Sequence, residues 1–196
     1  MAKLVLKFLT IVILFQAGNG DMLRPVNNIT LGSRLYPQNN PYWVSPSRIF
    51  AFGFYEKGDG FAVGIWPLAV GPERIVTWTA NRDDPPISSN AYLELTEEGK
   101  LLVRTTDTAS GFIPIVYNLQ APATSASLLD SGNFVLSDGD NVIWNSFDYP
   151  TDTILGGQTL LSGESLISSV SVADRSSGRF KLVIAVCQSV SFPIPI

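Results

Sequence analysis

Histidine is absent from this 196-residue chain, and cysteine occurs once, as Cys187. Without histidine, a Ser-His-Asp triad, a histidine-ligated zinc site and histidine acid-base catalysis are all excluded. A single cysteine likewise excludes an internal disulfide and a zinc site built only from thiolates. Much of enzyme chemistry is therefore ruled out, and we expect no catalytic residue, no cofactor and no metal site.

Charge is scarce as well. Charged residues make up 15% of the chain, and 17 acidic residues face 13 basic ones, for a net charge of -4. Proteins that bind nucleic acid neutralise its phosphates with clustered lysine and arginine. An acidic chain with few cations is poorly suited to that task, so we expect no nucleic-acid partner.

No apolar run is long enough to span a bilayer. The N-terminus carries Lys3 and Lys7, then the apolar stretch 8–15, then small residues up to Gly20, which is the order of a secretory signal peptide. Both this stretch and the later apolar stretch 180–186 are much shorter than the ~20 residues of a membrane-spanning helix. We therefore predict a signal peptide at residues 1–20, no membrane span, and secretion of the mature protein.

One Asn-x-Ser/Thr sequon is present, formed by Asn28, Ile29 and Thr30. Such a tripeptide accepts an N-linked glycan when it is exposed in a secreted protein. The sequon follows shortly after the predicted signal peptide. We predict glycosylation at Asn28.

The remaining sequence is rich in short strand patterns. Phe50, Phe52 and Phe54 alternate with small residues, so the three rings share one face of a strand. Further candidate strands, each bounded by Gly, Pro, Asp or Asn, span residues 61–66, 74–80, 91–96, 100–105, 112–119, 126–129, 134–136 and 142–145. No long segment has helical periodicity. The chain is predicted to be an all-β sandwich, barrel or prism, with a core made of Phe50, Phe52, Phe54, Trp66, Trp78 and Trp144.

Two weak internal repeats support a pseudo-symmetric fold. Residues 75–81 and 142–147 each place a tryptophan at the end of a β-branched strand. Residues 97–103 and 130–136 each join a tight turn to an apolar strand, as in a hairpin. Repeated units of this kind predict several similar sheets that cover one core.

Five segments, in this order, resemble the bulb-type (snowdrop-like, mannose-binding) lectin domain, as found in the ectodomains of plant G-type lectin S-receptor-like serine/threonine-protein kinases: 45–55, 64–66, 78–86, 129–136 and 143–153. The resemblance implies a β-prism II fold of three antiparallel four-stranded sheets with pseudo-threefold symmetry. It also implies a lectin domain over residues 21–182 and an extracellular (apoplastic) location. It further implies that full-length relatives are anchored in the plasma membrane.

In this family a sugar site reads Gln-x-Asp-x-Asn-x-Val-x-Tyr along one strand, where every second residue faces the sugar. Aligned on Asn133 and Val135, this sequence keeps two of those five residue types. Asp130 lies an odd number of residues before Asn133 and faces the opposite side, unless a turn at 131–132 changes the register. The resemblance thus implies a degraded mannose site at Asp130, Ser131, Asn133, Val135 and Ser137.

An earlier copy of the motif departs further from the family. Its five positions hold Thr96, Glu98, Lys100, Leu102 and Arg104. Lys100 and Arg104 flank the place where the sugar would lie.

The C-terminal residues 183–196 diverge from the family. The resemblance implies that a third sheet would be completed after Leu182, so we expect the third repeat to be incomplete. A bare sheet edge pairs readily with other chains. The mature chain is therefore expected to self-associate.

Taken together, the sequence predicts a secreted, non-catalytic carbohydrate-recognition module whose partner is a mannose-type glycan or glycoprotein. The alternative is a protein-interaction or decoy module for another receptor ectodomain that has lost sugar binding. A glycosidase would need paired carboxylates. The candidates at Asp83, Asp84, Asp148 and Asp152 stand in turn sequences, where carboxylates cap backbone amides.

Overall fold

The computed structural model describes residues 28–39, 41–68 and 74–184. Every element in these residues is a strand, apart from one 3₁₀ turn, η1 (Ser146–Asp148). The all-β prediction is confirmed. The predicted signal peptide (1–20), most of the divergent tail and Cys187 lie outside the described residues.

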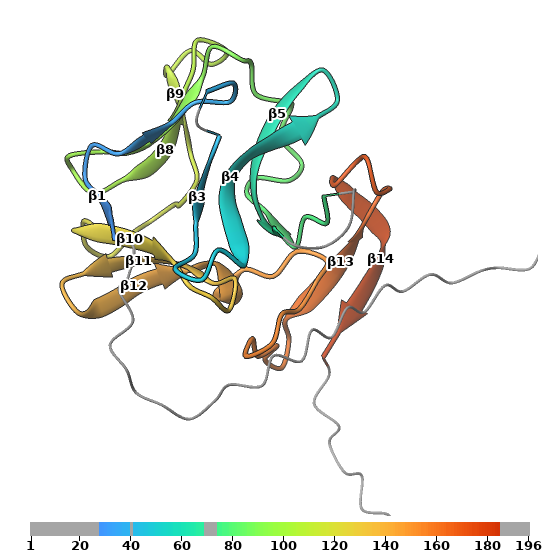
Figure 1. Cartoon of the computed structure of the whole chain (residues 1–196). Coiled ribbons are helices and arrows are strands. Elements are labelled where there is room, and N and C mark those ends of the chain that lie inside the picture. Colours follow the sequence, from blue (N-terminus) through green and yellow to red (C-terminus); the bar gives the residue numbers. More distant parts are fainter. Residues whose placement is uncertain (1–27, 40, 69–73, 185–196) are drawn as a thin grey trace, which may run out of the picture.

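Twelve strands form three antiparallel four-stranded sheets that surround one core, as in a β-prism (Figure 1). The first sheet has the order β1 (Ile29–Thr30), β10 (Ser125–Leu128), β11 (Phe134–Asp138), β12 (Asn141–Asn145). The second sheet has the order β2 (Arg34–Leu35), β7 (Tyr92–Leu95), β8 (Leu101–Arg104), β9 (Phe112–Pro114). The third sheet has the order β3 (Tyr42–Val44), β4 (Phe50–Lys57), β5 (Gly60–Pro67), β6 (Trp78–Thr79).

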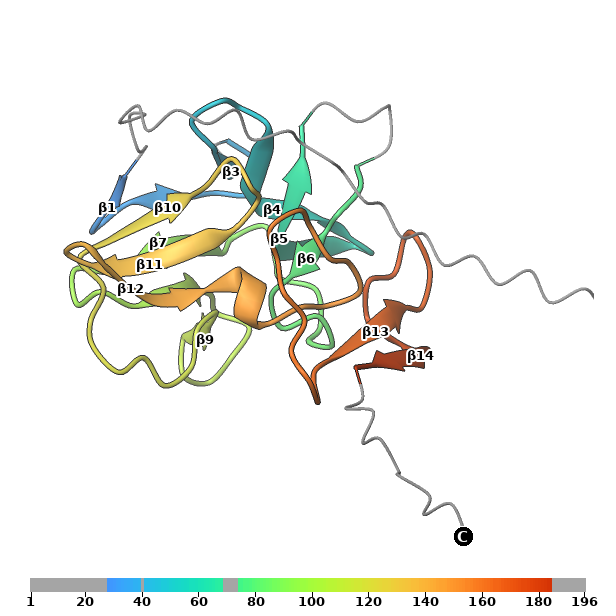
Figure 2. The same cartoon turned by 90° about the horizontal axis from the view of Figure 1, so that it is seen from below.

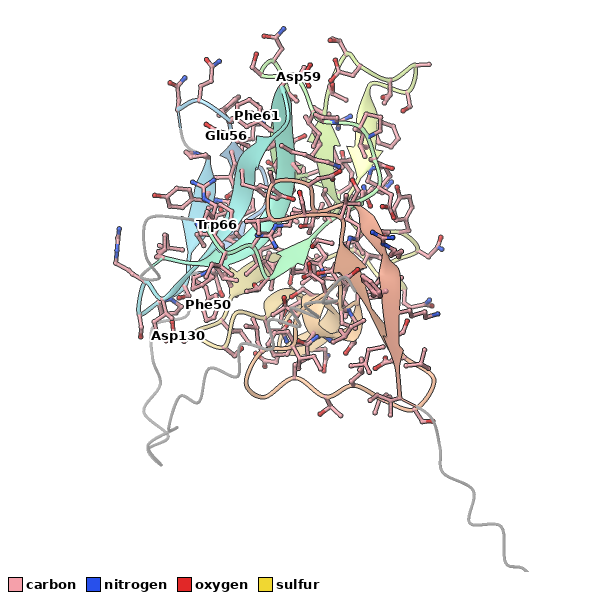
Figure 3. All side chains as sticks on the ribbon, turned by 90° about the vertical axis from the view of Figure 1, so that its right-hand side faces the viewer. Phe50, Glu56, Asp59, Phe61, Trp66 and Asp130 are labelled. Atoms are coloured by element: carbon pink, nitrogen blue, oxygen red, sulfur yellow. The ribbon has the colours of Figure 1, made fainter. Side chains whose placement is uncertain are left out.

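The third sheet corrects one expectation. It is complete, and it is built from residues 42–79 rather than from residues after Leu182. Its centre is the long β4–β5 hairpin, which runs from Phe50 at one end to Glu56 and Asp59 near its turn (Figure 3). The alternating phenylalanines of β4 thus already supply the sheet that the resemblance located at the C-terminus, and the prediction of an incomplete third repeat is wrong.

Aromatic rings connect the sheets at the core. Phe52 of the third sheet stacks on Phe134 of the first sheet, with ring centroids 3.8 Å apart. Trp78 meets Trp144 edge to face at 6.1 Å, and each lies in the last strand of its sheet. All six predicted core residues are buried, as predicted. Five of them belong to the central core, whereas Trp66 lies in a second buried cluster. Trp43 is partly buried and stacks on Phe52.

A separate hairpin, β13 (Ser165–Ser169) and β14 (Ser177–Val183), lies beside the third sheet (Figure 2). Arg82 is 9% exposed and holds it through carbonyl oxygens: its Nε donates to Arg175 at 2.7 Å and its Nη1 to Ile167 at 2.8 Å. The neighbouring Asp83 accepts hydrogen bonds from the backbone N–H and the hydroxyl of Ser177. Leu182, after which completion of a third sheet was expected, therefore lies in this hairpin.

Candidate functional site

The predicted strand residues on the first sheet share a face. Phe134 and Leu136 of β11 are fully buried in the core, so the residues between and beside them point outward. Asn133, Val135 and Ser137 lie on this outer face, as the alternation predicts. Val135 is itself 6% exposed.

Asp130 and Ser131 lie in the turn that joins β10 to β11. The backbone N–H of Gly132 closes this turn by donating a hydrogen bond to the carbonyl oxygen of Leu129 at 2.9 Å. The carboxylate of Asp130 accepts hydrogen bonds from the backbone N–H of Ser47 at 2.9 Å and from its hydroxyl at 2.7 Å. Asp130 therefore binds the β3–β4 loop, at the same end of the molecule as Phe50 (Figure 3). Ser131 is exposed, and its hydroxyl accepts from the N–H of Asn133.

Asn133 is tied to the fold by its amide oxygen. This oxygen accepts from the hydroxyl of Ser146 at 3.1 Å and from the N–H of Phe147 at 3.2 Å. Ser146 in turn accepts from the N–H of Phe134. The asparagine that anchors the family motif thus links β11 to η1. The first sheet brings the predicted residues near one another, but several of their polar atoms serve the fold.

The outer face of the second sheet holds a depression of about 340 Å³. Its lining residues are Arg34, Tyr92, Glu94, Thr96, Glu97, Glu98 and Arg104. Three of them, Thr96, Glu98 and Arg104, hold positions of the earlier motif copy. Lys100 and Leu102 of that copy do not line the depression. Of the two cations that the sequence placed beside the sugar, Arg104 therefore lies at a hollow in the surface and Lys100 does not line it.

Glu94 is the centre of this depression. Its side chain is 8% exposed and accepts from the Nε of Arg34 at 2.8 Å and from the Nε of Arg104 at 3.2 Å. The Nη2 of Arg34 lies 2.7 Å from the same carboxylate. The hydrogen bond to Glu94, and then its negative charge, raise the pKa of Arg34 above its ordinary value. Three neighbouring strands thus supply an Arg34–Glu94–Arg104 triad.

Aromatic rings support both arginines. The guanidinium of Arg34 lies 5.2 Å from the ring centroid of Tyr92, and that of Arg104 lies 6.0 Å from the centroid of Phe112. Tyr36 packs on Tyr92 at 5.6 Å. Sequence reasoning missed Arg34, Tyr92, Glu94 and Glu97. The alternation of Tyr92 and Glu94 in β7 with Thr96 just after it was the available signal, whereas Arg34 lies in a two-residue strand.

The outer face of the third sheet is apolar. Ala51, Tyr55, Ala62, Trp66 and Val76 form a second buried cluster there, and Arg74 lies over the ring of Trp66 (labelled in Figure 3) at 4.5 Å. The hydroxyl of Tyr55 bonds to that of Thr79 at 3.0 Å. This face offers a saccharide few polar groups.

Three of the four carboxylates considered for hydrolysis have structural partners. Asp148 accepts from the amide of Asn145, and Asp83 binds Ser177. Asp152 bonds to the hydroxyl of Ser169 and lies 3.9 Å from Arg82. Within residues 28–39, 41–68 and 74–184, no three His, Cys, Asp or Glu residues are grouped to hold a metal ion.

Comparison with known proteins identifies the family to which this chain belongs. The family model for D-mannose binding lectin matches residues 75–172, half of the chain. The chain belongs to the D-mannose binding lectin family. The matched region includes the complete first sheet except β1, three strands of the second sheet, and the predicted residues of β11.

Curated relatives agree with this lectin assignment. The G-type lectin S-receptor-like serine/threonine-protein kinase LECRK1 of Oryza sativa subsp. japonica is 36% identical over 168 residues, which cover 79% of this chain and 20% of the relative. LECRK4 of Oryza sativa subsp. indica is 38% identical over 168 residues, which again cover 79% of this chain and 20% of the relative. The receptor-like serine/threonine-protein kinase SD1-7 of Arabidopsis thaliana is 34% identical over 68% of this chain and 16% of its own length.

The chain spans about a fifth of the length of these relatives. Its similarity is to their lectin region, not to their kinase domain, and the lectin domain is non-catalytic. The expectation that this chain is no enzyme is confirmed on that basis. In the part of the chain that the structure describes, no helix is long and apolar enough to cross a membrane.

Proposed function

We propose that this lectin domain is secreted and binds mannose-type glycans of glycoproteins through the outer face of β11. The observation that carries the proposal is the D-mannose binding lectin match, which contains Asn133, Val135 and Ser137. By strand alternation these residues share one outward face, with an apolar side chain, 6% exposed, between two polar ones. Paired donors and acceptors suit sugar hydroxyls, and the valine suits the apolar ring carbons.

The lectin domain is proposed to span residues 21–182, after a signal peptide at 1–20 that directs the chain to the extracellular space. Asn28 is proposed to carry an N-linked glycan. Its side chain is exposed, and its Oδ1 accepts a hydrogen bond from Ser127 at 3.1 Å, whereas a glycan is attached to the other amide atom, Nδ2. Mass spectrometry of the secreted chain before and after glycosidase treatment tests both proposals.

A gain of binding tests the mannose site. The family motif has Tyr where this chain has Ser137, so Ser137→Tyr adds a hydroxyl and a ring to the proposed sugar seat. We expect a mannose-rich glycan array to show mannoside-competed binding that is at least threefold stronger for this variant. Val172→Tyr, on an exposed position between β13 and β14 and away from this sheet, is the control. Equal binding by all three proteins, or no mannoside competition, would contradict the site.

A second candidate function is protein interaction, and the β13–β14 hairpin favours it. Exposed apolar side chains gather there: Val170, Val172, Phe180, Leu182, Val183 and Ile184. Such a patch suits another receptor ectodomain or a second copy of this chain. The bare edge of an incomplete third sheet no longer supports self-association, because that sheet is complete.

The two candidates respond to different substitutions. In the interaction module, Leu182→Ser and Phe180→Ser together abolish capture of a receptor ectodomain or dimer formation in size-exclusion chromatography. The same double variant leaves glycan binding unchanged. A glycan array that stays silent while receptor capture depends on these two residues would favour the interaction module over the lectin.

A further inference from the structure

We propose that a cleft between the last strands of the three sheets binds one ring of a neutral saccharide whose hydroxyls are equatorial, such as a β-linked glucan. This inference rests on the proposed carbohydrate-recognition function, but it assigns a second site away from the outer face of β11. The cleft has a volume of about 240 Å³, near the lower end of small-ligand sites, which suits a single sugar ring. Its lining residues lie in β6 and β12 or directly follow β6, β9 and η1.

The three sheets contribute side chains of unequal size to this cleft. Trp78 stands three residues before Asn81, and Ile115 stands three residues before Asn118. Both asparagines have positive φ, +46° and +57°, so the two segments correspond in the second and third sheets. The first sheet supplies Trp144 from β12. Two sheets thus place a tryptophan at the cleft where the second sheet places a smaller isoleucine, and room for a ligand remains.

Aromatic rings form the walls. Tyr149 stacks on Trp144, with centroids 5.5 Å apart and planes at 16°, and is still 56% exposed. Tyr117, from the segment after β9, is 58% exposed. The carbonyl oxygen of Tyr149 accepts a hydrogen bond from the Nε1 of Trp78 at 2.8 Å, which holds η1 against the third sheet. A wall that is fixed before the ligand arrives loses less conformational entropy on binding.

Polar atoms in the cleft suit sugar hydroxyls. The Nδ2 of Asn81 donates to the carbonyl oxygen of Pro114 at 2.8 Å, which fixes the amide. Among the described residues, the Oδ1 of Asn81 and the hydroxyls of Tyr117 and Tyr149 have no hydrogen-bond partner. They offer acceptors and donors of the kind that a saccharide needs. No charged residue is found among the described residues that line the cleft, which favours a neutral ligand.

The aromatic walls also favour one shape of sugar ring. A glucose ring in β linkage carries its substituents equatorially, so both of its faces present only C–H groups. Such a flat apolar face packs on an aromatic ring, whereas the axial hydroxyl of mannose interrupts one face. The cleft is therefore suited to a different sugar from the one proposed for β11.

NMR titration of the secreted chain with cellotriose, a neutral β-linked glucan, tests the site. The indole N–H signals of Trp78 and Trp144 should shift, whereas that of Trp66, which does not line the cleft, should stay in place. Tyr149→Ala removes one wall and should weaken cellotriose binding at least fivefold. Tyr36→Ala removes an exposed tyrosine beside the second sheet, outside the cleft, and is the matched control.

A second variant fills the cleft instead of opening it. Ile115→Trp adds the ring that the other two sheets already supply, and should abolish cellotriose binding. Ile184→Trp adds the same ring at an exposed position after β14 and should leave binding unchanged. Thermal melts establish that both variants are folded. If Ile115→Trp does not fold, Tyr149→Ala alone decides.

Three results would overturn the inference: no binding of cellotriose, equal binding by the wild type and Tyr149→Ala, or shifts of Trp78 and Trp144 with indole but not with cellotriose. The last result would assign the cleft to an aromatic ligand. Methyl α-mannoside, followed at the amide signals of Asn133 and Ser137, reports on the proposed function separately. Mannoside binding without cellotriose binding defeats only this inference. Cellotriose binding without mannoside binding supports it and defeats the mannose assignment on β11.

Discussion

The prism and the β13–β14 hairpin are held in place by opposite kinds of contact. In the prism, aromatic rings such as Phe52, Trp78 and Phe134 pack on one another and bury apolar surface in the core. The hairpin exposes many of its apolar side chains and is attached through Arg82 and Asp83. Apolar burial is distributed over many neighbours, whereas polar docking depends on individual donors. The two regions should therefore respond differently to the same type of substitution.

The largest expected difference comes from removing a phenyl ring in each region. Phe52→Ala leaves a cavity among fully buried rings and should lower the free energy of unfolding by about 3–5 kcal/mol. Phe180→Ala, in the exposed face of β14, should change it by less than about 0.5 kcal/mol. Denaturant titration followed by tryptophan fluorescence measures both. Similar midpoints for the two variants would refute the proposed division between core and hairpin.

The second prediction concerns a substitution that should destabilise the hairpin and spare the prism, the removal of one buried cation. Arg82→Met leaves several backbone carbonyls of the 167–176 segment without a donor, and should favour opening of the hairpin by about 2–4 kcal/mol. Arg179→Met removes an exposed cation from β14 and serves as the control. Amide hydrogen exchange should accelerate in β13 and β14 of the Arg82 variant, while the strands of the prism keep their protection. Uniform acceleration in all sheets would show that the hairpin does not open separately.

The third prediction compares two glycines that lie against the backbone of another segment with one glycine that has open space around it. A Cβ at Gly99 would overlap the backbone of Ala123, and Gly99 has φ +70°. Gly99→Ala should destabilise the whole prism by about 2–3 kcal/mol. A Cβ at Gly178 would come within 2.6 Å of the carbonyl oxygen of Ser169, so Gly178→Ala should accelerate exchange in the hairpin alone. Gly139 has φ +57° but open space around it. Gly139→Ala should therefore lower the free energy of unfolding, measured by thermal melts, by about 1 kcal/mol.

Periodicity explains which parts of the fold were predictable from the sequence. All eight candidate ranges and the 50–55 segment overlap observed strands, because alternation and flanking turn residues are local signals. The strands β1 and β2 have two residues each and no period to recognise. They exist because they pair with β10 and β7, far away in the chain. Tertiary pairing, not local pattern, also places the third sheet at residues 42–79.

The candidate site divides in the same way. The common face of Asn133, Val135 and Ser137 follows from the two-residue period of a strand. The contacts of Asp130 with Ser47, and of Glu94 with Arg34, join residues 83 and 60 positions apart. No sequence pattern indicates such pairs. The triad was therefore missed even though Arg104 had been singled out.

The smallest expected effect is a response of the hairpin to acid. Hydrogen bonds from the backbone N–H and then the hydroxyl of Ser177 lower the pKa of Asp83 below its ordinary value of about 3.9. A lowered pKa in the folded state means that the stabilisation is present above that ordinary value and is lost as pH falls through the lowered one. The amide signals of Ser177 and Gly178 in NMR spectra should therefore move toward unfolded positions only below about pH 4, while the indole signal of Trp78 stays unchanged. Asp83→Asn removes the titrating group, and its hairpin signals should lose this transition. A transition of equal size in that variant would assign the acid response to another carboxylate, for which Asp174 is the nearest candidate because the N–H of Ser176 lowers its pKa in the same way.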